Sequence, residues 1–157
     1  DAQEWPDTLQ VNYDFAGGQL MCYEMRIWSA YHFEGEEEGA AVYGDQGYLV
    51  MGNKRFRVFD PKGKQVLEET GTYTNDVAHA QNFLDCMRSR KRPNADLETV
   101  GHPSSALCHM GNCAWRAGRT LRFDPDTYTF TGDNDANQYL TRAEYRKPYE
   151  LPKISAL

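Results

Sequence analysis

The chain has 157 residues, of which 40% are hydrophobic and 25% are charged, and its formal net charge is −6. This length and composition are typical of one globular domain with a buried core, so we expect a single domain over residues 1–157. The negative charge argues against nucleic acid as the main partner, because binding the phosphate backbone requires a basic face. No apolar run approaches the roughly 20 residues that span a bilayer, so we expect no membrane partner either.

The first half of the chain shows the two-residue period of β-strands. In the first such stretch, Leu9, Val11 and Tyr13 alternate with Gln10 and Asn12, which is the pattern of a half-buried strand with one wet face. The strands expected between residues 8 and 68 lie at about 8–15, 19–28, 40–43, 48–51, 54–59 and 64–68. Short, glycine-containing connections favour antiparallel hairpins, and the lack of strand–helix–strand alternation argues against a parallel doubly wound sheet.

Two amphipathic helices are predicted in the second half, at residues 76–91 and 103–117. The first carries an apolar stripe and ends in a basic run before Pro93, which suits the negative end of the helix dipole. The second has Pro103 in its first turn and Gly118 as its C-terminal cap.

These elements predict an α+β fold with an open, mainly antiparallel β-sheet and two main helices packed on one face. Short strands are expected at 120–123 and 128–131. The tail over residues 133–157 should begin with a short helical piece at about 133–140 and continue as an irregular segment rich in proline and charge.

The sequence carries no self-contained catalytic signature. No GxGxxG follows a strand, and no P-loop, HExxH or GxSxG motif occurs. We therefore predict no catalytic, cofactor-binding or metal-binding residue within this chain. His102, His109 and Cys113 share one helix face and could ligate zinc, but they lack a fourth ligand at compatible spacing, so polar helix packing is the better interpretation.

His79 and the four cysteines are interpreted as structural. His79 lies beside the apolar stripe of the first helix, and we favour a buried or half-buried histidine that hydrogen-bonds to the sheet over one at the edge of a ligand site. The four cysteines contain no CxxC pair, so we expect reduced thiols in or near the core.

The best candidate site is the loop from Trp28 to Glu38, which has neither a helical nor a strand period. Aromatic rings stack on sugar rings, and carboxylates and histidine exchange hydrogen bonds with hydroxyl groups. A solvated acidic loop is an equal alternative on these residues alone, and Glu36-Glu37-Glu38 is interpreted as surface charge. The candidate substrate-binding residues are Arg26, Trp28, Tyr31, His32 and Glu34.

Several segments together resemble the Gfo/Idh/MocA oxidoreductases, the relatives of glucose–fructose oxidoreductase and inositol dehydrogenase. Residues 79–93 (HAQNFLDCMRSRKRP) resemble a late helix of that family. Residues 111–125 (GNCAWRAGRTLRFDP) resemble the closing helix and strand of one bacterial branch, and residues 145–149 (YRKPY) resemble its tail. Arg26-Ile27-Trp28 through Gly35, followed by Tyr43-Gly44-Asp45-Gln46-Gly47, is similar to its sheet segment.

The resemblance implies the C-terminal α/β domain of an enzyme whose N-terminal Rossmann domain binds NAD or NADP. Since the chain starts at Asp1 without an initiator methionine, we expect a cut piece, with the nucleotide loop and the catalytic pair upstream of it. His79 lies in the later helix motif and is not the family's catalytic histidine. The resemblance also implies a sugar or polyol substrate, a homo-oligomer formed through the exposed sheet face, and a bacterial protein of the cytoplasm or the periplasm.

The sequence therefore predicts a domain that supplies a substrate wall and an oligomer interface and is inactive alone. Two alternatives stay open. One is a carbohydrate-binding module without catalysis, and the other is a pure assembly module whose loop binds nothing.

Overall fold

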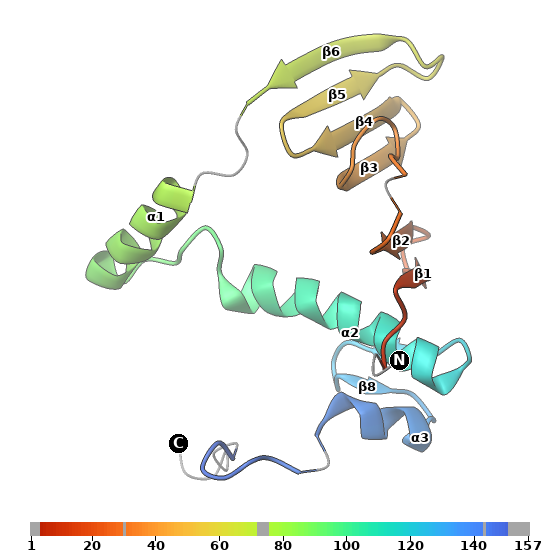
Figure 1. The fold of residues 1–157 in the computed structure, drawn as a ribbon, viewed down its shortest axis with the longest axis vertical. Helices are drawn as coiled ribbons and strands as arrows, with labels where there is room; N and C mark the ends of the chain where they lie inside the picture. Colours follow the sequence, from red (N-terminus) through yellow and green to blue (C-terminus); the bar gives the residue numbers. More distant parts are fainter. Residues whose placement is uncertain (1–3, 30, 72–75, 143, 151–157) are drawn as a thin grey trace. The chain divides into compact units, whose positions relative to one another are not determined.

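The computed structural model describes residues 4–29, 31–71, 76–142 and 144–150 (Figure 1). The chain divides into two compact units, one formed by Pro6–Asn94 and the other by Asp1–Trp5 with Ala95–Leu157. The single domain expected over residues 1–157 stays a prediction.

The unit Pro6–Asn94 begins with a two-stranded antiparallel ribbon. Strand β1 (Thr8–Asp14) pairs with β2 (Leu20–Arg26), with Thr8 opposite Arg26 and Asp14 opposite Leu20. Burial alternates along both strands, as the two-residue period predicts for a ribbon with one wet face.

A four-stranded antiparallel meander follows in the order β3-β4-β5-β6. Its strands are β3 (Gly39–Gly44), β4 (Gly47–Gly52), β5 (Arg55–Phe59) and β6 (Gln65–Thr70). The register sets Tyr48 opposite Phe59 and Val50 opposite Arg57, so all four side chains share one face. On that face the rings of Tyr43, Tyr48 and Phe59 stack in a row, with centroids 5.3 and 4.6 Å apart, and Val50 is only 2% exposed.

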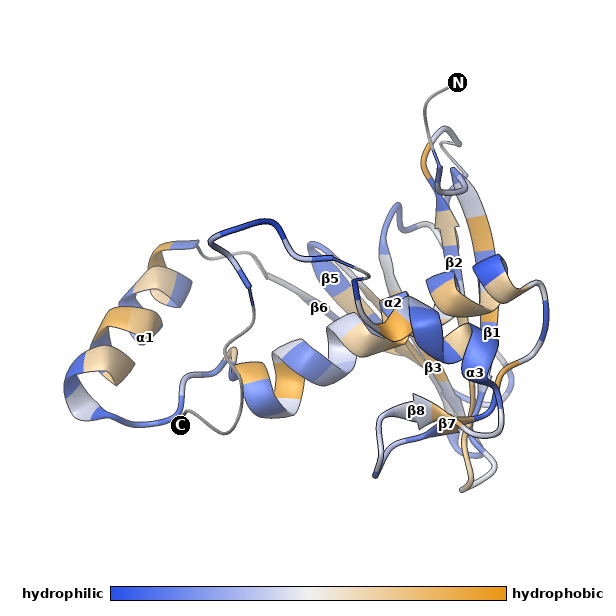
Figure 2. Cartoon of the chain, turned by 90° about the horizontal axis from the view of Figure 1, so that it is seen from below, coloured by the Kyte–Doolittle hydropathy of each residue, from blue (hydrophilic) through white to orange (hydrophobic). Residues whose placement is uncertain are grey.

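Helix α1 (Asp76–Ser89) closes this unit. It ends before the predicted residue 91, because Arg90 adopts a left-handed backbone (φ 58°) and donates its N–H to the carbonyl oxygen of Cys86. Hydrophobic and hydrophilic residues are interleaved along the helix in Figure 2. The predicted stripe is exposed, with Val77 at 80% and Phe83 at 58%.

The other unit is built on helix α2 (His102–Ala117), preceded by a π-helical turn (Leu97–Gly101). The cap predicted at Gly118 is confirmed, since this residue is left-handed and its N–H bonds to the carbonyl oxygens of Ala114 and Trp115. A short hairpin of β7 (Phe123–Asp124) and β8 (Thr129–Phe130) follows, then α3 (Asn134–Asn137) and a 3₁₀ turn (Gln138–Leu140).

The core of this second unit lies where α2, β8 and α3 meet. Cys113, Phe130 and Ala136 are buried together. The side chain of Asn137 accepts from the N–H of Phe130 at 2.7 Å and donates to its carbonyl oxygen at 3.0 Å, which ties α3 to β8. Arg119 pairs with Asp133 through two hydrogen bonds of 2.9 and 2.6 Å, and this guanidinium lowers the pKa of Asp133.

The predicted α+β class and the antiparallel pairing are confirmed. The six strands expected between residues 8 and 68 are present, but within the described residues they form two sheets, because β1 and β2 pair with each other and the meander begins at β3. Strands β7 and β8 form a separate two-stranded hairpin. Alternation within a strand shows which side chains share a face but not which strand lies beside it. Packing of both helices on one sheet face stays a prediction.

Candidate substrate-binding loop

The loop between β2 and β3 presents large aromatic side chains to solvent. Trp28 is 79% exposed, Tyr31 76% and Phe33 54%, and His32 is also exposed. Exposed apolar surface of this kind is unfavourable in water, and where several such side chains gather they mark a binding surface. This is the loop that the sequence singled out.

Arg26, the last residue of β2, holds the start of the loop. Its guanidinium lies 3.1 Å from the Glu24 carboxylate and donates from Nη2 to the carbonyl oxygen of Tyr31 at 3.2 Å. It also lies 5.6 Å from the centroid of the Tyr31 ring, a cation–π contact. Arg26 therefore orients Tyr31 through both backbone and ring.

The far end of the loop is a tight turn from Phe33 to Glu36. These two residues exchange backbone hydrogen bonds of 3.0 and 2.9 Å, and both residues between them are left-handed, Glu34 at φ 52° and Gly35 at φ 77°. Two central residues with positive φ define a type I′ turn, in which glycine is favoured and glutamate is not. Other contacts must therefore hold Glu34 in this conformation.

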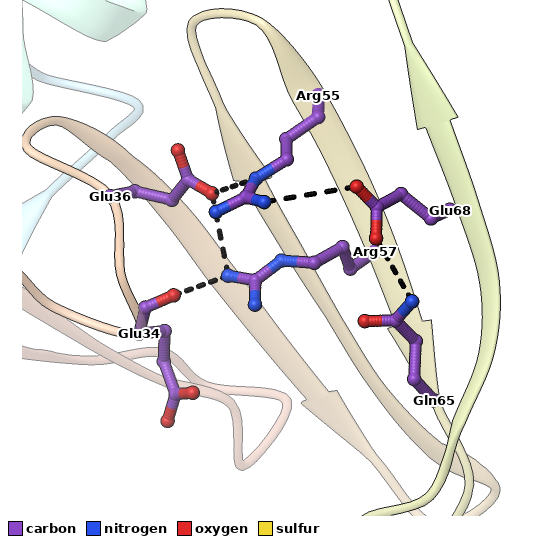
Figure 3. Close-up of polar contacts among 6 residues, drawn as sticks. All are labelled: Glu34, Glu36, Arg55, Arg57, Gln65 and Glu68. Atoms are coloured by element: carbon purple, nitrogen blue, oxygen red, sulfur yellow. Dashed lines mark hydrogen bonds and ion pairs between the residues drawn. The ribbon is translucent and has the colours of Figure 1, made fainter.

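Those contacts come from β5, as Figure 3 shows. Glu36 Oε1 accepts from Arg55 Nε at 2.7 Å and from Arg57 Nη2 at 3.3 Å. Arg57 Nη2 also donates to the carbonyl oxygen of Glu34. Glu68 on β6 lies 3.7 Å from Arg55. We call Glu36, Arg55, Arg57 and Glu68 the loop clamp.

The clamp is largely shielded from water at its centre. The side chains of Glu36 and Arg57 are each 15% exposed, and that of Arg55 is 35% exposed. The hydrogen bond to Glu36 raises the pKa of Arg55 above its ordinary value. The interpretation of Glu36 as surface charge is therefore wrong, although its neighbours Glu37 and Glu38 are exposed.

A family model described as "Oxidoreductase family, C-terminal alpha/beta domain" (GFO_IDH_MocA_C2) matches residues 30–151. The match runs from this loop through the meander and both long helices into the tail, which is well over half of the chain. The chain belongs to this Gfo/Idh/MocA family. No curated protein and no solved structure matches it.

The predicted site residues lie together in one stretch of this Gfo/Idh/MocA domain. Arg26 and Tyr31 are in direct contact, and Trp28 and His32 lie exposed beside them in sequence. Glu34 contributes its carbonyl oxygen to the clamp, while its carboxylate points away from Arg57 in Figure 3. Their role in binding substrate stays a prediction.

Sequence reasoning missed Arg55 and Arg57 as site residues. The signal was present, because both alternate with Phe56 and Val58 along β5 and so lie on one face. The sequence does not show that this face of β5 lies against the acidic loop, which is about 20 residues earlier in the chain.

The isolated histidines and cysteines of this Gfo/Idh/MocA domain do not assemble a site in the described residues. His102 packs against the Tyr128 ring at 5.0 Å, Cys113 is buried in the core, and no group of three His, Cys, Asp or Glu in the described part could hold a metal ion. Burial raises the pKa of Cys113, which keeps the thiol protonated and unreactive. His79 is exposed, so the prediction that it is buried or half-buried is wrong.

The four cysteines are free, but Cys22 and Cys108 are exposed, so the expectation of thiols in or near the core fails for these two. None of the helices in the described ranges has the length and apolar character needed to cross a bilayer.

The Gfo/Idh/MocA family generally uses NAD or NADP, and this raises the question of whether the described residues could hold a dinucleotide. Every strand pair in them is antiparallel, and no strand–helix–strand unit opens on a glycine-rich loop. The phosphate cradle of a Rossmann site needs that unit, because the pyrophosphate sits at the N-terminus of its helix. The described residues do not fit the cofactor.

Proposed function

We propose that this chain supplies the substrate wall and an oligomer interface to an NAD(P)-dependent sugar or polyol oxidoreductase and is inactive without the domain that binds the nucleotide. The observation that carries this proposal is the exposed aromatic loop held by Arg26 and the clamp. Membership in an oxidoreductase family supports the reaction class.

The chemistry of the loop suits a polyhydroxylated ligand. The faces of Trp28 and Tyr31 offer flat apolar surfaces for the C–H faces of a sugar ring, and His32 and the Glu34 carboxylate offer donors and acceptors to its hydroxyl groups. The loop is already folded around a type I′ turn, so little ordering is needed when a ligand arrives.

The second face of the meander supports the proposed homo-oligomer. Val42, Met51 and Leu67 lie on the face opposite the clamp and are 56%, 39% and 43% exposed. An apolar sheet face of this kind is stabilised by contact with a second copy of the same face. A carbohydrate-binding module without catalysis and a pure assembly module remain the rival functions.

The isolated chain is expected not to bind NAD⁺ or NADP⁺. Titration calorimetry with either nucleotide should give no saturable heat up to about 1 mM, which corresponds to a binding free energy weaker than about −4 kcal/mol. Extending the chain with its nucleotide-binding domain should restore binding. Micromolar affinity of the 157-residue chain for either nucleotide would overturn the proposal that a separate domain binds the nucleotide.

Replacing Trp28 and His32 with alanine is expected to weaken substrate binding by the complete oxidoreductase. Losing the stacked ring and the hydrogen-bonding imidazole should raise KM for a sugar or polyol about tenfold, with kcat changed less than about threefold. His109→Ala is the control, because His109 is exposed on α2, outside the loop. An unchanged KM in the double variant would instead favour the pure assembly module.

A further inference from the structure

The loop clamp holds the candidate binding segment in place as well as supporting the fold. We infer that Glu36, held between Arg55 and Arg57, is the positioning residue that presents the Tyr31–Glu34 segment to a sugar or polyol. The inference rests on the proposed function of the loop, and it assigns a role to residues that never touch the substrate themselves.

Burial distinguishes Glu36 from the other carboxylates of the loop. Its side chain is 15% exposed and bonds to two guanidinium groups, whereas Glu34, Glu37 and Glu38 are exposed. Hydrogen bonds between ionised partners are about twice as strong as neutral ones, and shielding from water strengthens them further. Glu36 is therefore the residue that fixes the loop on β5.

The charges of the clamp are balanced within it. Arg55 and Arg57 contribute two positive charges, and Glu36 and Glu68 contribute two negative charges. A site for an anionic substrate would carry excess positive charge, which this cluster lacks. The arginines therefore serve to hold the loop, and recognition is left to its exposed side chains.

The backbone of the loop is held through the same clamp. Arg57 donates from one nitrogen both to the Glu36 carboxylate and to the carbonyl oxygen of Glu34. This second bond fixes the peptide of a glutamate in the left-handed conformation that it would otherwise avoid. Loss of the Glu36 carboxylate would therefore release the whole turn that follows Tyr31 and His32.

Gly52 at the end of β4 leaves the space that the Glu36 side chain occupies. A Cβ on Gly52 would lie 2.2 Å from Oε2 and 2.6 Å from Cδ of Glu36. Alanine there must push the carboxylate off its partners, although it changes no charge. Gly52→Ala and Glu36→Gln therefore disrupt the same contact in different ways, the first by a steric clash and the second by removing the negative charge.

The chain offers matched controls for both substitutions. Glu37→Gln removes the same charge from the adjacent exposed residue. Gly44→Ala adds the same methyl group to another glycine of the meander, where the nearest atom would lie 3.8 Å away. Each control repeats the chemical change without disturbing the clamp.

The first measurement is hydrogen exchange of the 157-residue chain, read by mass spectrometry on peptides covering residues 31–38. The amides of Phe33 and Glu36 are bonded within the turn, so Glu36→Gln and Gly52→Ala should each speed their exchange about tenfold while peptides from β4 and β5 stay protected. The double variant should exchange no faster than about twofold beyond either single variant, since both changes break one contact.

The second measurement uses D-glucose and myo-inositol as probes with the complete oxidoreductase. Releasing the loop removes preorganised binding, so each single variant should raise KM about tenfold for the probe that is turned over, with kcat within about twofold of wild type. Glu37→Gln and Gly44→Ala should leave both parameters unchanged.

The outcomes separate this inference from the proposed function. Unchanged exchange in both variants would overturn the clamp, and faster exchange with an unchanged KM would show a structural role only and also overturn the inference. Wild-type enzyme that turns over neither probe would overturn the proposed function itself, together with the role that rests on it, before any variant is compared.

Discussion

Replacing Gly47 with alanine is expected to destabilise the four-stranded meander by about 4 kcal/mol. Gly47 begins β4 with φ 136°, a backbone conformation that residues with a Cβ rarely adopt. A Cβ at this position would also lie 2.1 Å from the carbonyl oxygen of Phe59, which belongs to the backbone of β5. Relief requires the two strands to separate, because a backbone carbonyl cannot rotate away as a side chain does.

Gly44→Ala is the control for this prediction, because Gly44 lies opposite Gly47 in the same hairpin but its Cβ would come no closer than 3.8 Å to its nearest neighbour, an ordinary van der Waals contact. Urea unfolding followed by far-ultraviolet circular dichroism should show the loss in Gly47→Ala, whereas Gly44→Ala should stay within about 1 kcal/mol of wild type. Equal stabilities of the two variants would contradict the close strand approach at Gly47.

The elements of this chain were predictable because their determinants are local. Alternating side chains and glycine-containing turns located every strand from β1 to β6 within a few residues. Pro103 and Gly118 gave both ends of α2. The end of α1 was missed by two residues, because Arg90 takes a left-handed conformation that the backbone preferences of arginine do not predict.

The arrangement of those elements was less predictable, since it depends on contacts distant in sequence. The alternation of polar and apolar residues does not show that the strands divide into a ribbon and a meander. Likewise, the candidate loop was found from its aromatic and acidic composition, but the anchoring of Glu36 was not. Its burial depends on Arg55 and Arg57, 19 and 21 residues further along the chain.

Phe130→Ala is expected to cost the α2 unit about 4 kcal/mol of folding free energy. Phe130 is 2% exposed, packs with Cys113 and Ala136, and meets the edge of the Phe123 ring at a centroid distance of 5.7 Å. Its backbone bonds to Asn137 do not involve the ring, so the substitution removes packing and leaves those hydrogen bonds in place. The cost is therefore the lost transfer free energy of the ring plus that of the cavity left behind.

A second substitution at Phe130, which removes less volume than alanine does, tests whether the cost depends on the size of the cavity. Phe130→Leu fills most of the cavity and should cost only about 1.5 kcal/mol. Urea unfolding can be followed by tryptophan fluorescence, since Trp5 and Trp115 lie in this unit with their ring centroids 6.0 Å apart. Alanine and leucine variants of equal stability would contradict a packed core at Phe130, because a cavity term must grow with the volume removed.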